Sequence, residues 1–130
     1  MKSYEILYTS VLARDAPVTA VAGLMSGARK FNQAHGITGL MVFDGERFVH
    51  LLEGPRDAVF ALLEKIRLDP RHTDMKTLHY AAQEQARFNR FTTGLVPVEH
   101  NDVLGKLTAT QGATALSHLV DLIPLLDLDR

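Results

Sequence analysis

Two apolar segments joined by Asp44-Gly45 constrain the fold of this chain more than any other feature. Ile37–Phe43 and Arg47–Leu52 are rich in the branched and aromatic residues that strands favour. Between such segments, Asp-Gly is typical of a tight hairpin turn, because glycine accepts the positive φ that the turn needs. The sequence therefore predicts two adjacent antiparallel strands, around which the rest of a sheet can form.

The residues before this hairpin predict a strand and a helix. Tyr4–Ser10 has the composition of a strand. Asp15-Ala16-Pro17 supplies a capping residue and an early proline, both of which mark helix starts. The helix is expected to end near His35-Gly36. Its apolar face recurs every three or four positions, at Val18, Val21, Ala22, Leu24, Met25, Ala28 and Phe31.

The residues after the hairpin predict a second helix and two further strands. The helix starts after Gly54-Pro55 and ends at Asp69-Pro70. Its apolar positions have helical spacing: Val59, Phe60, Leu62, Leu63 and Ile66. Met75–Ala82 and Gly94–Val98 complete the order βαββαββ. This order predicts an α+β fold of the ferredoxin-like type, a sandwich with two helices on one face of the sheet.

The tail after Val98 carries a third apolar helical stripe. It comprises Ala115, Leu116, Leu119, Val120, Ile123 and Leu126. Because two helices already cover one face of the sheet, we expect this tail to cover the other face or to meet a partner. The predicted division is a domain at residues 1–98 and a C-terminal helical extension at residues 99–130.

Composition excludes several classes of function. The chain has no cysteine, which removes disulfides, thiol catalysis and zinc–thiolate sites. Its six histidines lack the spacing of metal-binding motifs, so no metal is expected. A net charge of -1 without a basic cluster argues against nucleic acid and membrane surfaces. No signal peptide or long apolar segment is visible, so a cytoplasmic protein is expected.

Three polar residues are predicted to face the interior. Strand alternation turns Tyr8 to one face of its strand, and places His50 on the same face as Phe48 and Leu52. A buried tyrosine needs a partner for its hydroxyl, and the amide of Asn32 offers an acceptor and two donors in one plane. The pattern is equally compatible with a core tyrosine bonded to a backbone carbonyl, and with an asparagine that caps its own helix.

The ordered set of motifs resembles the BLUF family, the flavin-binding sensors of blue light. The matching residues are Tyr8, Asn32, Gly36-Ile37-Thr38-Gly39, Leu52-Glu53-Gly54-Pro55 and Asp69-Pro70-Arg71-His72. In that family the flavin lies between the two helices over the sheet, with the Asn at the ring's polar edge and the Tyr bonded to a Gln. Light drives electron transfer from the Tyr, and the Gln hydrogen bonds then rearrange to a red-shifted state.

The resemblance implies FAD as cofactor, with Tyr8, Asn32, His50, Arg71 and His72 as its binding residues. A cation at Arg71 can neutralise phosphate, and an imidazole at His72 can pack on or bond to the ring edge. The other interpretation of this pair is a solvated cap after the second helix.

The chain also departs from the family pattern. His50 stands where the family has the Gln, and an imidazole cannot reproduce the rearrangement of a carboxamide. Gly94 and Val96 are aligned with positions where the family usually has a Trp and then a Met, and the chain contains no Trp. These departures imply a retained fold with an impaired photocycle.

Two functions follow from the resemblance. The first is a stand-alone, non-enzymatic light sensor that signals to a separate effector protein through its sheet or tail, with a homo-oligomer as one form of assembly. The alternative is a flavin-free interaction or dimerisation module on the same fold. An acylphosphatase-like enzyme needs an arginine in an anion-binding loop, and Thr9–Ala16 offers only Arg14 without glycines. RNA binding needs sheet aromatics and a basic surface, which are not visible.

Overall fold

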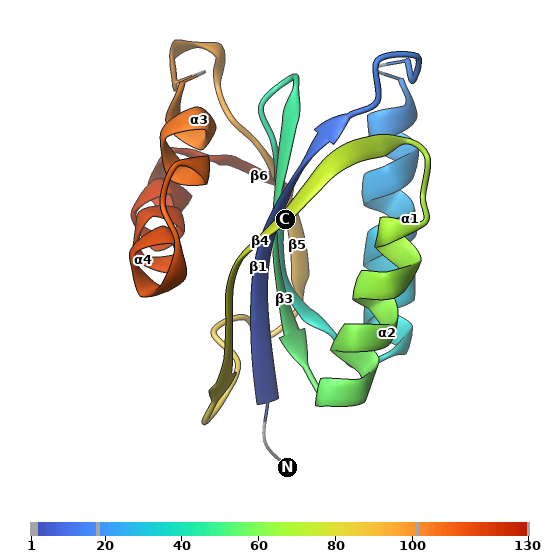
Figure 1. Cartoon of the computed structure of the whole chain (residues 1–130), viewed down its shortest axis with the longest axis vertical. Helices are drawn as coiled ribbons and strands as arrows, with labels where there is room; N and C mark the ends of the chain where they lie inside the picture. The colour runs from blue at the N-terminus through green and yellow to red at the C-terminus, as the bar shows by residue number, and fades with distance from the viewer. Residues whose placement is uncertain (1–2, 18, 101, 130) are drawn as a thin grey trace.

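A six-stranded sheet with helices on both faces organises the chain (Figure 1). The computed structural model describes residues 3–17, 19–100 and 102–129. The strands are β1 (Ser3–Leu12), β2 (Thr38–Phe43), β3 (Arg47–Gly54), β4 (His72–Gln83), β5 (Phe91–Leu95) and β6 (Asp127–Asp129). The helices are α1 (Ala20–Ala34), α2 (Arg56–Arg67), α3 (Val103–Thr108) and α4 (Gly112–Leu122), with short 3₁₀ turns at Val98–His100 and Ile123–Leu125.

The strand order is β4-β1-β3-β2-β5-β6. β3 is antiparallel to both β1 and β2, while β5 runs parallel to β2 and antiparallel to β6. The strands β1 and β3 are thus neighbours although 42 residues separate Tyr8 from His50, which lie opposite each other. The predicted ferredoxin-like α+β fold is confirmed.

The β2–β3 hairpin forms as predicted around Asp44-Gly45. Oδ1 of Asp44 accepts hydrogen bonds from the backbone N–H groups of Glu46 and Arg47, at 2.9 and 2.7 Å. Gly45 has a φ of 103°, which residues other than glycine rarely adopt. The turn chemistry fixes the register, and the register decides which strand residues face the helices.

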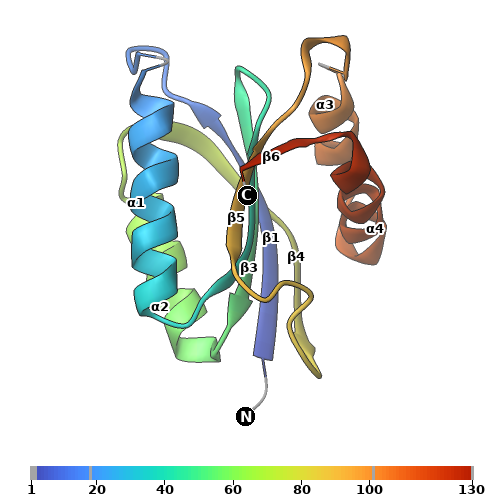
Figure 2. The ribbon, with the colours of Figure 1, turned by 180° about the vertical axis from the view of Figure 1, so that it is seen from behind.

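Helices cover both faces of the sheet (Figures 1 and 2), and each face has its own hydrophobic core. Along β3, Phe48 and Leu52 pack under α1 and α2, while Val49 and Leu51 pack under α3 and α4. This alternation follows from the period-two geometry of strands. Both faces are covered, so the tail lies on the second face of the sheet, one of the two places expected for it.

Some element predictions are wrong in detail. The tail forms two helices and the short strand β6 rather than one stripe, because Thr110-Gln111-Gly112 interrupts the helix and Gly112 takes a φ of 64°. β5 begins at Phe91 rather than Gly94, because the β-branched Thr92 and Thr93 pair with β2. Phe60 is 38% exposed and lies against Tyr80 instead of the core. Val18, assigned to the first helix, lies outside the described residues.

Candidate functional site

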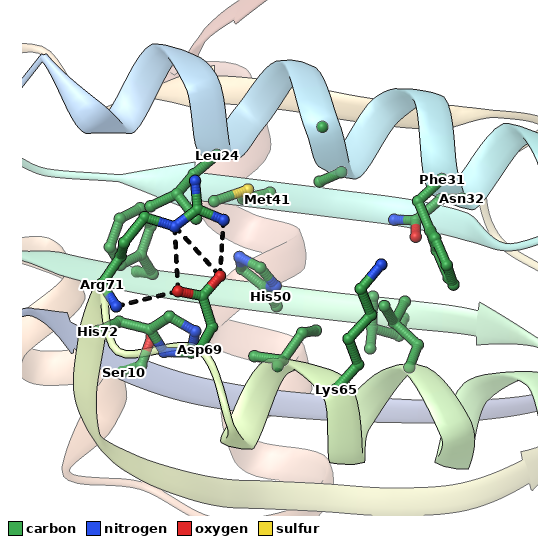
Figure 3. Close-up of a pocket in the computed structure, with 16 residues that line it drawn as sticks. Ser10, Leu24, Phe31, Asn32, Met41, His50, Lys65, Asp69, Arg71 and His72 are labelled. Carbon is green, nitrogen blue, oxygen red and sulfur yellow. Dashed lines mark hydrogen bonds and ion pairs between the residues drawn. The ribbon is translucent and has the colours of Figure 1, made fainter.

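A cavity lies between α1 and α2, on the sheet face that these helices cover (Figure 3). Its volume is about 170 Å³, which is more than ten times the roughly 15 Å³ that one water needs. Apolar side chains form most of the lining. The polar residues in the lining are Ser10, Asn32, His50, Lys65, Asp69, Arg71 and His72. A mainly apolar cavity with a few convergent polar groups is the usual form of a small-molecule site.

Tyr8 and His50 form a buried pair on the sheet side of this cavity. The Tyr8 hydroxyl and Nδ1 of His50 share a hydrogen bond, and the ring centroids are 4.6 Å apart. Burial raises the pKa of the Tyr8 phenol. Burial, with His72 as the lesser cause, lowers the pKa of His50 from 6.5 to about 3. Both side chains are therefore neutral at neutral pH, and the tyrosine's partner is a side chain rather than a backbone carbonyl.

Asn32 lies near the end of α1 and is 1% exposed. Its main-chain carbonyl accepts hydrogen bonds from the backbone N–H groups of His35 and Ile37, at 3.1 and 2.9 Å. The backbone of Asn32 therefore ends the helix, and its side chain is not needed as a cap. Oδ1 of the amide is buried at the cavity and has no hydrogen-bond partner among the described residues. The interpretation of Asn32 as a side-chain cap is thus wrong.

Arg71 and His72 reach the cavity from the start of β4 (Figure 3). The Arg71 guanidinium pairs with Asp69 through Nε at 3.0 and 3.2 Å and Nη2 at 2.7 Å. The hydrogen bond from Arg71 holds the pKa of the Asp69 carboxyl below its usual value, so the two charges compensate each other. Burial lowers the pKa of His72, and its Nδ1 is buried without a partner in the described structure. The Arg71 side chain is 48% exposed and pairs locally with Asp69, as a solvated cap would, whereas His72 is partly buried at the cavity.

Three buried polar atoms at this cavity lack partners within the described residues: Asn32 Oδ1, His50 Nε2 and His72 Nδ1. Native proteins satisfy nearly all buried polar groups, so such a group calls for a ligand or an ordered water. The three belong to α1, β3 and β4, which surround one cavity. A ligand or water in the cavity with hydrogen-bonding groups would satisfy them. Of the five predicted residues, these three and Arg71 line the cavity, and Tyr8 contacts it through His50.

The sequence analysis missed two residues that help to form the site. Lys65 lines the cavity from α2, and its Nζ lies 3.9 Å from the centre of the Phe31 ring. A helical projection could have found Lys65, because it follows the inward-facing Leu62 by three positions. Asp69 was predicted as a helix stop and as the first residue of the Asp69-Pro70-Arg71-His72 motif, but not as a site residue that pairs with Arg71 at the cavity.

Gly94 and Val96, predicted as altered positions around the pocket, do not line the cavity. A Cβ on Gly94 would meet Leu128 of β6 at 2.8 Å, and Val96 packs with the core under α3 and α4. On the other face of β5, Phe91 belongs to the core under α1 and α2, and Thr93 accepts a hydrogen bond from Arg29 at 2.6 Å. The departures from the family pattern at Gly94 and Val96 therefore leave the cavity lining unchanged.

Within residues 3–17, 19–100 and 102–129, no three histidines or carboxylates are grouped closely enough to hold a metal ion. In the same ranges, none of the helices has the length and apolar character needed to span a membrane.

Known proteins share sequence and fold with this chain. A family model, BLUF, described as sensors of blue-light using FAD, matches residues 4–94. The photoactivated adenylate cyclase subunit beta of Euglena longa is 40% identical over 82 residues, which are 62% of this chain and 10% of the relative. The blue light- and temperature-regulated antirepressor BluF of Escherichia coli K12 is 31% identical over 102 residues, 76% of this chain and 25% of the relative.

A solved structure shares the fold as well as sequence. Klebsiella pneumoniae BlrP1 with FMN and cyclic diGMP has a TM-score of 0.63 and 32% identity, over 67% of this chain and 23% of that chain. The present chain therefore spans a minor part of these relatives. The region that the family model matches runs from β1 into β5 and contains the residues that line the cavity.

Proposed function

This chain belongs to the BLUF family, and from that premise we propose that it binds FAD in the cavity between α1 and α2 and acts as a blue-light sensor. The observation that supports flavin binding most strongly is the set of three unpartnered polar atoms around one cavity. A flavin has a flat apolar ring and a polar edge with donors and acceptors, which matches a cavity of this character. The FMN named for BlrP1 adds support for a flavin in general.

The residues present fit such a cofactor. Asn32, at the end of α1, would hold the polar edge of the ring through its amide. Phe31, Leu24 and Leu62 supply apolar contact, and Lys65 supplies positive charge at the cavity for a phosphate, whereas the charge of Arg71 is compensated by Asp69 unless a phosphate displaces that carboxylate. When bound, the flavin would supply absorption of blue light and an acceptor for an electron. Tyr8 is the nearby oxidisable residue, and it reaches the cavity through His50.

The light response is proposed to differ from that of the family. A carboxamide can exchange its donor and acceptor by turning over, whereas a neutral imidazole carries one donor and one acceptor on opposite sides of its ring. His50 is further fixed by its bond to Tyr8 and by the edge of Phe48, at a centroid distance of 6.2 Å. An electron taken from Tyr8 would return before any rearrangement could occur. The usual signalling state is therefore impaired.

Signalling is proposed to pass through protein contacts, and the domain itself does not carry a catalytic site. The related proteins include an adenylate cyclase subunit and an antirepressor, so relatives act on effectors of different kinds. We propose a protein effector for this chain, with a homo-oligomer as one form of assembly and the cytoplasm as location. Residues 1–98 are proposed as the sensor domain. Residues 99–130 are proposed as the extension through which a change in the sheet is passed to the effector.

Flavin uptake tests this proposal. The purified protein is reconstituted with FAD and, separately, FMN, and the bound flavin is measured by its absorption after gel filtration. We expect stoichiometric uptake, and a loss of affinity of about tenfold or more in Asn32→Ala, because one set of ring hydrogen bonds is missing. Gln33→Ala is the matched control, since Gln33 is the adjacent amide on α1 and is exposed. A wild-type protein that takes up neither flavin would favour the flavin-free interaction module.

A further inference from the structure

The hydrogen bond between Tyr8 and His50 has a direction that burial determines. Tyr8 is 0% exposed and His50 is 7% exposed. The Tyr8 hydroxyl carries one hydrogen, and the partner that the described structure gives it is Nδ1 of His50. If Nδ1–H were the donor, the phenol hydrogen would be left buried without an acceptor. If the phenol is the donor, both its hydrogen and the lone pair of Nδ1 are satisfied.

A phenol that donates to Nδ1 determines where the ring hydrogen of His50 lies. Burial keeps this imidazole uncharged, and an uncharged imidazole has a single hydrogen, which must then be on Nε2. Nε2 is buried and has no partner within the described ranges. His50 itself lines the cavity from β3 (Figure 3). The unused N–H is thus the group that His50 offers to a ligand.

We propose that Tyr8 is a positioning residue that locks His50 in the tautomer with hydrogen on Nε2, so that the sheet presents a fixed N–H donor to the cavity. The complementary group is on α1, where Oδ1 of Asn32 is an unpartnered acceptor. A ligand that fits both must place an acceptor toward β3 and a donor toward α1. A glutamine at position 50 could turn over and accept either arrangement, whereas the locked imidazole accepts one.

The lock is a property of the protein alone, while its use in ligand selection rests on the proposed function. The test is the ¹⁵N–¹H correlation spectrum of the histidine rings in the ligand-free full chain at neutral pH. The His50 signals are assigned by their absence in His50→Gln. We expect a bare Nδ1 and a protonated Nε2 in the wild type. In Tyr8→Phe we expect a mixture of tautomers, because the phenol that fixed the hydrogen is gone.

Tyr80→Phe is the matched control, since Tyr80 is 46% exposed and lies on β4 away from the cavity lining. Its spectrum should keep the wild-type tautomer of His50. A wild-type ring with hydrogen on Nδ1 would overturn the proposal, and so would a Tyr8→Phe ring that keeps the pure Nε2–H form. If Tyr8→Phe does not fold, a wild-type ring with hydrogen on Nδ1 would still overturn the proposal.

Adding FAD tests the ligand part separately. With flavin bound, as shown by absorption, the Nε2 hydrogen should exchange more slowly with water and its resonance should shift, while Nδ1 stays bare. Bound flavin that moves the hydrogen to Nδ1 would overturn the selection role. Absence of any flavin binding would overturn the proposed function, and the tautomer would still be judged from the ligand-free spectrum.

Discussion

At the scale of single residues, the site depends on side chains whose neighbours the strand pattern could indicate only in part. Alternation was enough to place Tyr8 and His50 on one face, and the register brings them together. Two features depend on side-chain geometry that no local pattern encodes. One is the hydrogen bond of Tyr8 to Nδ1 of His50, and the other is the absence of a hydrogen-bond partner for Asn32 Oδ1 among the described residues. The same burial makes His50 sensitive to acid.

The pKa of His50 predicts a pH dependence of stability. The folded value of about 3 is below the usual 6.5, so the unfolded chain binds this proton at higher pH than the folded protein does. The resulting loss in the free energy of unfolding is absent above pH 6.5 and grows as the pH falls toward 3, by at most about 1.4 kcal/mol per pH unit. Urea unfolding of wild type and His50→Gln should show a shallower pH dependence for the variant. His118→Gln, an exposed histidine on α4, should match the wild type, and equal slopes for all three would contradict the prediction.

At the scale of elements, a close backbone approach at Gly39 and a buried carboxylate at Glu53 position the strands that form the floor of the cavity. Gly39 of β2 has a φ of 135°, and a Cβ there would lie 1.9 Å from the carbonyl oxygen of Leu51 on β3. The carboxylate of Glu53, 0% exposed at the end of β3, accepts hydrogen bonds from the backbone N–H groups of Arg87 and Phe88, at 2.7 and 3.1 Å. These contacts link β3 to its neighbour and to the segment that leads into β5.

Gly39→Ala should therefore be severely destabilising. Both the positive φ and the clash with backbone oppose a side chain, and a loss of about 3 kcal/mol or more in the free energy of unfolding is expected. Gly45→Ala is the matched control, because Gly45 also has a positive φ, of 103°, but would meet nothing within 4 Å. Chemical denaturation measures both. Equal losses for the two variants would mean that the clash with Leu51 is relieved.

Glu53→Ala should loosen the segment before β5 and lower stability by roughly 2–4 kcal/mol, because buried backbone donors lose their acceptor. Hydrogen exchange should accelerate most at the amides of Arg87 and Phe88. Glu84→Ala, at an exposed glutamate in the same segment, is the control and should leave these amides protected. Unchanged protection in Glu53→Ala would show that the carboxylate is not what holds the segment.

At the scale of the whole molecule, the sequence predicted the sandwich because each of its first elements has a clear period and turn signal. The start of β5 was misplaced by three residues, since Thr92-Thr93-Gly94 carries no marker of the first paired residue. β6 could not be predicted: Asp127–Asp129 is three residues long, and Arg29 of α1 pairs with Asp129 at 2.7 Å only in the folded chain. Lys65 likewise reaches the site through tertiary packing.

The C-terminal helices should contribute to the stability of the whole fold. Leu119 of α4 is 1% exposed in the core under that helix, so Leu119→Ala should cost about 2–5 kcal/mol. The adjacent Val120 is 41% exposed, and Val120→Ala should cost much less. Urea denaturation of both variants gives the comparison. A Leu119→Ala protein as stable as the wild type would mean that α4 is not integral to the core.

The central claim is that this BLUF protein binds flavin but that His50 blocks the usual photocycle, and a light-minus-dark absorption spectrum tests it most directly. The flavin-loaded wild type should give no reversible red shift under blue light. His50→Gln should move the spectrum toward the family's red-shifted state, although Gly94 and Val96 still depart from the family pattern. A normal, reversible red shift in the unmodified, flavin-loaded protein would contradict the account.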